Sequence, residues 1–280
     1  MQRPPSSFYN EIMKKAYVSR KAGKSLVAYL AEQGYEINTV TEYGIVNQHT
    51  SNIDRALGIE EHEDGTMHAT RPIHVDPRIS THPDIYMCQL GLWSEAGIFF
   101  GDPDKLGRKY PDDIIYNAVC TKNYVLHLLE KTDPDLANAM LTWRQELAYA
   151  GREENQETKI LGVRQGYTRC MCLPVDNDSF IVSDEGLAIP LEDQGAHVLL
   201  ISKGHIKLDG FDSGFIGGCG GHIYVNTDGM TNQRAIVFNG DLSVHPDFKA
   251  ITDFIKSRNI LPVWFEDYGL EDIGSILAIE

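Results

Sequence analysis

Short apolar runs alternate with amphipathic stretches along most of the chain, and the N-terminal part shows the order clearly. An apolar run at residues 16–19 predicts a strand, and the next stretch places Leu26 and Leu30 on one face of a helix. Gly34 predicts the end of that helix, and residues 36–37 resume as a strand. This pattern predicts a strand, helix, strand unit.

Two later segments repeat the order. The first has the strand Phe180–Ser183, a helix capped by Asp184 that ends near Gly195, and the strand His197–Ile201; the second has the strand Ala235–Phe238, a helix from about His245 to Asn259, and the strand Leu261–Phe265.

The middle of the chain predicts less regular units. Residues 85–88 pair with residues 97–100, and a hairpin joins residues 117–120 to residues 124–127. Asp133-Pro134 then starts a helix that extends towards Tyr149. The last apolar run, residues 275–279, has no later partner, so we expect it to pair with the strand near Tyr17-Val18.

About five strand-rich units, each carrying a helix, indicate radial repetition within one α/β domain that covers residues 1–280. The predicted fold is a five-bladed, pseudo-symmetric α/β-propeller. Residues 41–72 are polar and lack a dependable period, so they are predicted to form an insertion or a lid.

Charge and cysteine content narrow the function classes. A formal net charge of -15 would repel a phosphate backbone, so no nucleic-acid partner is expected, whereas a cationic small molecule is favoured. No stretch is long and apolar enough for a bilayer span, and no membrane partner is expected. Five cysteines, an odd number, argue against a secreted disulfide framework, and a cytoplasmic location is predicted. The oligomeric state is left open.

The segment Gly166-Tyr167-Thr168-Arg169-Cys170-Met171 carries the main candidate chemistry. A neighbouring cation such as Arg169 favours a thiolate over a thiol, and a thiolate is the nucleophilic form of cysteine. The alternative is that Cys170 packs as a small apolar residue.

Together with five units, several motifs give the chain a family resemblance. They are His82-Pro83-Asp84-Ile85, Tyr110 to Asn117, Gly166 to Cys170, Gly204 to Leu208, Gly214 to Gly218, and Asp272-Ile273-Gly274-Ser275. On these motifs the chain resembles an uncharacterised bacterial family of the pentein superfamily, the five-bladed propeller fold of guanidine-modifying enzymes. More distantly it resembles the arginine and agmatine deiminases.

The resemblance implies a cysteine-dependent hydrolase or amidinotransferase that acts on a guanidine or amidine compound through a covalent thiol intermediate. Cys170 would be the nucleophile, His82 the acid and base, and Asp84 a catalytic carboxylate that helps to hold the cation. The candidate substrate-binding residues are Asp112, Asp113, Asn117 and Arg169. No cofactor is implied. The superfamily also has a non-catalytic branch, so a binding or scaffold protein is the alternative.

Three further residues are weaker candidates: Cys219, His222 and Asp241. Cys219 lies in a glycine run that more often serves close backbone approach than catalysis. Cys170, Cys172, Cys219 and His222 could together supply four zinc ligands, but their spacing is not that of a recognised zinc finger or ribbon, and no metal is predicted.

Overall fold

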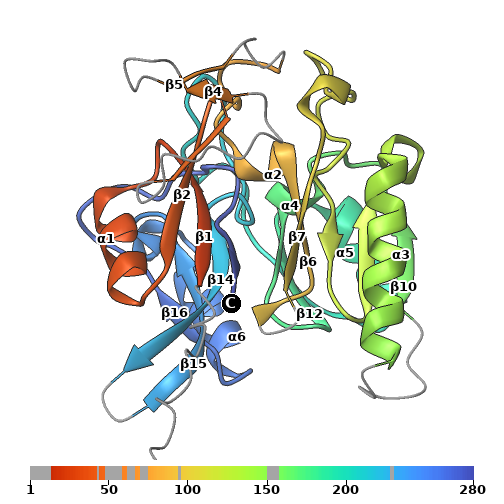
Figure 1. The fold of residues 1–280 in the computed structure, drawn as a ribbon. Coiled ribbons are helices and arrows are strands. Elements are labelled where there is room, and N and C mark those ends of the chain that lie inside the picture. The colour runs from red at the N-terminus through yellow and green to blue at the C-terminus, as the bar shows by residue number, and fades with distance from the viewer. Residues whose placement is uncertain are drawn as a thin grey trace, which may run out of the picture.

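The computed structural model describes residues 14–42, 44–47, 59–61, 67–69, 75–93, 96–149, 158–227 and 230–280. They form a mixed α/β fold, in which short sheets are accompanied by helices (Figure 1). Within these ranges, no helix has the length and apolar character needed to cross a membrane.

Four sheets share one topology, in which two antiparallel strands are followed by a helix and a strand parallel to the second. Numbered along the chain, these are the first, third, fourth and fifth sheets. The first has β17 (Leu277–Ile279), β1 (Lys15–Ser19), α1 (Lys24–Glu32) and β2 (Glu36–Thr41), and the third has β8 (Val119–Cys120), β9 (Tyr124–His127), α3 (Pro134–Tyr149) and β10 (Lys159–Gly162). The fourth has β11 (Cys172–Pro174), β12 (Ser179–Val182), α5 (Glu185–Asp193) and β13 (His197–Leu200), and the fifth has β14 (Gly220–Thr227), β15 (Met230–Phe238), α6 (Phe248–Lys256) and β16 (Leu261–Val263).

The second sheet contains only the antiparallel pair β6 (Met87–Leu90) and β7 (Gly97–Phe100). The single-turn helix α2 (Pro83–Tyr86) precedes it, so the predicted strand at residues 85–88 begins two residues later than expected. Pro83 explains the difference, because its fixed φ suits the first position of a helical turn.

Part of the segment predicted as an insertion belongs to the first sheet. β3 (Gly44–Asn47) pairs antiparallel with β2, and the strands β4 (Ile59–Glu61) and β5 (Met67–Ala69) form a separate hairpin. Residues 48–58, 62–66 and 70–72 lie outside the described residues.

Local signals account for the ends of the helices. The Asp184 carboxylate accepts a hydrogen bond from the Gly186 amide at the start of α5, as expected from the sequence. Pro134 begins α3, and Gly34 follows α1 with φ at +85°, a conformation that glycine adopts without a Cβ penalty.

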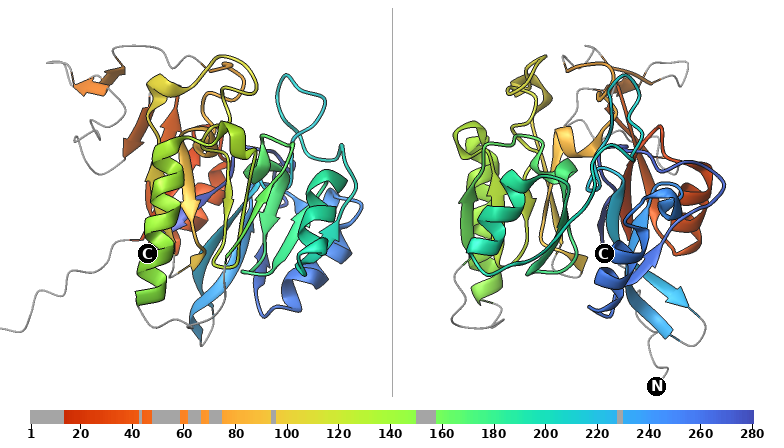
Figure 2. Two further views of the ribbon diagram at one scale, coloured as in Figure 1. Left: turned by 90° about the vertical axis from the view of Figure 1, so that its right-hand side faces the viewer. Right: turned by 180° about the vertical axis from the view of Figure 1, so that it is seen from behind.

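Apolar side chains fill the spaces between neighbouring sheets. One cluster joins the first three sheets through Tyr17, Met87 and Val125, and another joins the third and fourth sheets. Two more join the fourth to the fifth and the fifth back to the first. α1 and α3 lie at opposite sides of the molecule, outside the sheets (Figures 1 and 2). The packing therefore follows a cyclic order.

The last strand closes this order as predicted. β17 pairs antiparallel with β1, with Tyr17 opposite Leu277. The two ends of the described chain thus share one sheet, although most of the sequence separates them.

Candidate active site

Five short segments, one before the first strand of each sheet, meet at the centre of the structure. They are residues 82–86 before β6, residues 113–117 before β8, residues 167–171 before β11, residues 214–219 before β14, and residues 272–275 before β17. We call this set the central ring.

Hydrogen bonds join each segment of the central ring to the next. Asn117 Nδ2 donates to the Asp84 carbonyl, and the Arg169 amide donates to Asn117 Oδ1. The Gly218 amide then donates to the Cys170 carbonyl. The Ser275 amide donates to the Gly218 carbonyl, and the Asp84 amide donates to the Gly274 carbonyl, which closes the circuit. Polar backbone groups at the buried centre are thereby paired across the sheets.

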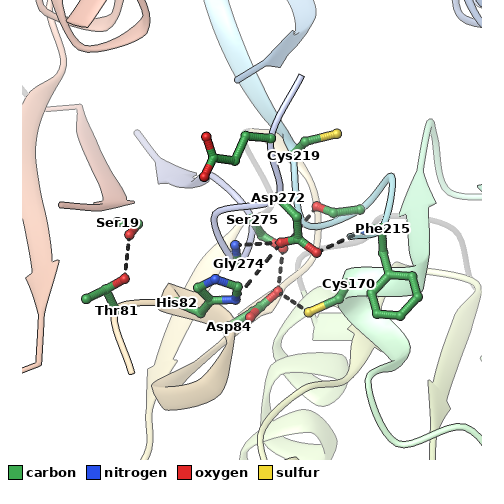
Figure 3. A network of polar contacts seen from close by, with 12 residues as sticks. Ser19, Thr81, His82, Asp84, Cys170, Phe215, Cys219, Asp272, Gly274 and Ser275 are labelled. Carbon is green, nitrogen blue, oxygen red and sulfur yellow. Dashed lines mark hydrogen bonds and ion pairs between the residues drawn. The ribbon is translucent and has the colours of Figure 1, made fainter. Parts of the chain in front are cut away.

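Cys170 contacts a carboxylate within the central ring. It lies in the single-turn helix α4 (Thr168–Met171), and its Sγ is 3.0 Å from Asp84 Oδ2 and 3.3 Å from Asn117 Nδ2. The Ser275 hydroxyl donates to the same Asp84 oxygen over 2.7 Å. Asp84 Oδ1 is buried and has no hydrogen-bond partner (Figure 3).

His82 lies on the other side of the carboxylates. Its Nδ1 is 4.0 Å from Asp272 Oδ1, and its Nε2 is buried without a partner. Burial lowers the pKa of His82 to about 4, so the imidazole is neutral near pH 7. Burial and the nearby Asp84 raise the pKa of Asp272 to about 7.

The expected activation of the thiol by Arg169 is wrong for the structure as it stands. Burial, and then the charge of Asp84, raise the pKa of Cys170 well above its ordinary value. Arg169 donates its guanidinium hydrogens to the carbonyls of Gly217 and Gly220, so this cation joins two segments of the backbone. Cys170 is a thiol here.

The other predicted binding residues separate into two groups. Asn117 and Asp113 are both part of the central ring, and the buried Asp113 carboxylate accepts a hydrogen bond from the Tyr167 hydroxyl over 2.8 Å. Asp112 does not reach the ring, because its exposed carboxylate pairs with Lys131. The turn at this position therefore exposes the side chain of Asp112 and buries that of Asp113.

Residues 45–277 match a family described as a family of unknown function, DUF6873. The chain belongs to this family. No curated protein and no solved structure matches the chain. The part matched to DUF6873 includes all five segments of the central ring.

The weaker candidates have structural partners. The Cys219 thiol is fully buried and donates to the Ile216 carbonyl. His222 Nε2 contacts the Pro174 carbonyl at 2.7 Å, and its ring meets Trp93 edge-on. Asp241 accepts hydrogen bonds from Ser243 at the start of a short 3-10 turn. Among the described residues, no three His, Cys, Asp or Glu side chains are grouped as a metal site requires.

Asp272 and Ser275 belong to the central ring but were not among the predicted site residues. Asp272 accepts hydrogen bonds from the Phe215 and Gly274 amides, and Ser275 binds Asp84. Both belong to the Asp272-Ile273-Gly274-Ser275 motif. Its polar residues, directly before the last strand, were the signal in the sequence that could have identified them as site residues.

Residues 76–78 and 210–211 form a second polar layer next to the central ring. Electrostatic interactions link Tyr167 to both Cys170 and Asp76. Arg78 pairs with Asp76 at 2.6 Å, donates to the Gly210 carbonyl and lies 4.0 Å from the centre of the Phe211 ring. These contacts join residues 76–78 to residues 210–211, which precede two different segments of the ring.

Proposed function

We propose that the protein has a five-bladed α/β-propeller fold of the pentein type. Three observations support this: four sheets repeat one topology, the apolar clusters join neighbouring sheets in cyclic order, and the last strand pairs with the first. The closed circuit of hydrogen bonds through the central ring is what the pole of such a propeller would require.

We propose further that the protein is a cysteine-dependent enzyme that acts on a guanidine or amidine compound. The observation that carries this proposal is the 3.0 Å contact between Cys170 Sγ and Asp84 Oδ2, within one ring that also holds His82 and Asp272. A thiol, an imidazole and two carboxylates are the groups that covalent chemistry on a planar cation needs.

The proposed first half-reaction begins with transfer of the Cys170 proton to Asp84. The thiolate then attacks the guanidinium carbon and forms a C–S bond. The bond from that carbon to the leaving nitrogen breaks, and the amine departs with the proton that Asp84 took from Cys170. The product is an amidino group on Cys170.

In the second half-reaction, water attacks the amidino carbon while neutral His82 accepts one of its protons. A C–O bond forms, the C–S bond breaks, and the proton on His82 passes to the Cys170 sulfur. The oxygen loses the second proton of the water to solvent as the urea-type product leaves. With an amine as the acceptor in place of water, the same steps give amidine transfer.

A bound cation would reverse the electrostatics that hold Cys170 as a thiol. The pKa of Cys170 is raised by burial and by Asp84 and Asp272. A guanidinium beside these groups would neutralise their field and stabilise the thiolate, so the substrate itself would help to form the nucleophile. Asp84 Oδ1 and His82 Nε2, both without partners, are the atoms free to bind it.

One observation favours the non-catalytic alternative. Cys170, His82 and Asp84 are each at most 3% exposed, and a Cβ on Gly218 would approach Asp272 to 1.9 Å. A centre packed this closely could serve only to hold the sheets together. If the protein is an enzyme, residues 76–78 and 210–211 of the second polar layer would need to separate before a substrate could reach Cys170.

The test is binding and turnover with guanidines. Agmatine and arginine at millimolar concentration should raise the melting temperature, and citrulline and urea should do so less, because they lack the guanidinium cation. Mass spectrometry of an acid-quenched reaction should find an amidino group on Cys170, and Cys170→Ser should abolish it. If a panel of guanidines causes neither a thermal shift nor an adduct in the folded protein, the non-catalytic alternative is correct.

A further inference from the structure

A cavity of about 200 Å³ lies beneath α3, away from the central ring. Its walls come from α3, from β9 and from β10. It shares no residue with the five ring segments. Drug-sized ligands usually occupy about 300–1,000 Å³, so this cavity suits a smaller molecule.

Most of the wall is apolar. Val125 and Met140 form buried parts of it, and Leu141 and Ile160 lie at its exposed rim, where they are 50% and 52% exposed. Large apolar side chains that remain half exposed around a hollow are a common feature of ligand sites.

The polar groups of the wall, apart from one, are already paired. His127 contacts Thr132 Oγ1 through Nδ1 at 2.7 Å and the Ile114 carbonyl through Nε2 at 2.9 Å. The Nε2 contact needs a proton on that nitrogen, so Nδ1 accepts from Thr132. Burial lowers the pKa of His127 to about 4, which leaves it uncharged near pH 7.

Arg144 is the charged residue of the lining, and it is half-buried. Among the described residues, no carboxylate lies within ion-pair distance of its guanidinium. The residues three and four positions away along α3 are Met140, Leu141, Leu147 and Ala148, none of which is acidic. Its charge acts on the buried thiol of Cys120, which indicates that the cation reaches towards the interior.

We propose that this cavity binds a small monocarboxylic acid with an apolar tail. The carboxylate would take both hydrogen bonds of the Arg144 guanidinium, and the tail would lie between α3 and the strands β9 and β10. A planar carboxylate matches the paired N–H groups of arginine, and the half-buried position strengthens the contact. This site is independent of the chemistry proposed for Cys170.

The experiment compares octanoate with 1-octanol by isothermal titration calorimetry. The two molecules have the same chain length and differ in the charged group. A hydrogen-bonded charge contributes about 1.5–3 kcal/mol, so octanoate should bind at least about tenfold more tightly than 1-octanol. Arg144→Gln should remove this preference, whereas Arg108→Gln, which removes the same charge from an exposed position, should leave it intact.

A second variant does not depend on the arginine. Ala137→Leu adds volume to the wall with a good helix-forming residue and should weaken both ligands, with the melting temperature of the free protein as the folding check. The proposal is overturned if octanoate binds no more tightly than 1-octanol, if it does not bind at millimolar concentration, or if Arg144→Gln binds it as the wild type does.

Discussion

Cys170 Sγ and Asp84 Oδ2 lie 3.0 Å apart at the centre of the fold, although 86 positions separate the two residues in the chain. The contact places a thiol against a carboxylate in a setting where both are buried. Burial and the negative charge of Asp84 both oppose formation of a thiolate.

An electrophile that carries a positive charge should react selectively at Cys170. 2-Chloroacetamidine and 2-chloroacetamide have the same leaving group, but only the first is cationic at neutral pH. We expect the amidine to alkylate Cys170 ahead of Cys88 and Cys120, because Asp84 and Asp272 attract it, and we expect the neutral amide to show no such preference. Peptide mass spectrometry measures both. Asp84→Asn should remove the selectivity, and equal labelling by the two reagents would contradict the prediction.

Removing the charge of Asp84 should not weaken the fold. Asp84 Oδ1 has no partner, and Asp84 raises the pKa of Asp272 through charge repulsion. Asp84→Asn is therefore expected to raise the free energy of unfolding by about 1 kcal/mol at pH 7. The proposed mechanism predicts that the same variant turns over no guanidine.

Ser275→Ala is the matched control for Asp84→Asn. It removes a hydroxyl that donates to the same carboxylate, and we expect it to lower the free energy of unfolding, measured in urea, by about 1.5–3 kcal/mol. A loss of stability in Asp84→Asn as large as in Ser275→Ala would indicate a structural role for Asp84.

Gly274 should tolerate no side chain. Its φ is +73°, and a Cβ would lie 2.1 Å from the Cβ of His82. Gly34 provides the control, because its φ is +85° but nothing lies within 4 Å of the added atom. Gly34→Ala should cost about 1 kcal/mol from backbone strain, and Gly274→Ala should cost a further 1–3 kcal/mol, roughly, from overpacking. Equal losses in thermal unfolding would show that the ring can relax around His82.

Acid should destabilise the protein below about pH 6.5. Burial lowers the pKa of His82 and His127 to about 4 and that of His222 to about 3, from 6.5 in the unfolded chain. Between these values the unfolded state binds more protons, so the free energy of unfolding falls as the pH falls. The shift in pKa corresponds to at most about 3 kcal/mol for His82 or His127 and at most about 5 kcal/mol for His222. Asp272, whose pKa is raised to about 7, and Asp113, whose pKa is raised by burial, act in the opposite direction. They act against four imidazoles, because burial also lowers the pKa of His245.

Urea unfolding at pH 5 and pH 7 measures this dependence. His127→Gln should reduce the difference between the two values, and His197→Gln, at an exposed position, should leave it unchanged. Greater stability at pH 5 than at pH 7 would contradict the prediction.

Arg78 should limit access to Cys170. Arg78→Ala removes the contacts with the Gly210 carbonyl and the Phe211 ring, and residues 76–78 should then separate more readily from residues 210–211. We expect faster alkylation of Cys170 by 2-chloroacetamide, with no change at Cys120. Unchanged rates at both cysteines would show that access does not pass through this layer.

Short-range patterns in the sequence were sufficient to predict most elements. Alternating apolar and amphipathic stretches, with Asp184, Pro134 and Gly34 at helix ends, predicted α1, α3 and α5 and the strands beside them. The pairing of the last strand with β1 was also predicted and is confirmed. These features depend on neighbours within a few residues, or on a single unpaired apolar run.

The chemistry of the site depended on distances that no local pattern contains. The sequence placed Arg169 beside Cys170 and suggested a thiolate, but the fold directs the guanidinium to the Gly217 and Gly220 carbonyls and brings Asp84 to the sulfur. Asp272 and Ser275 enter the site from the end of the chain. A pKa depends on burial and on all nearby charges, and in this protein five segments spread over nearly 200 residues supply them. Only their convergence decided that Cys170 is a buried thiol next to a carboxylate.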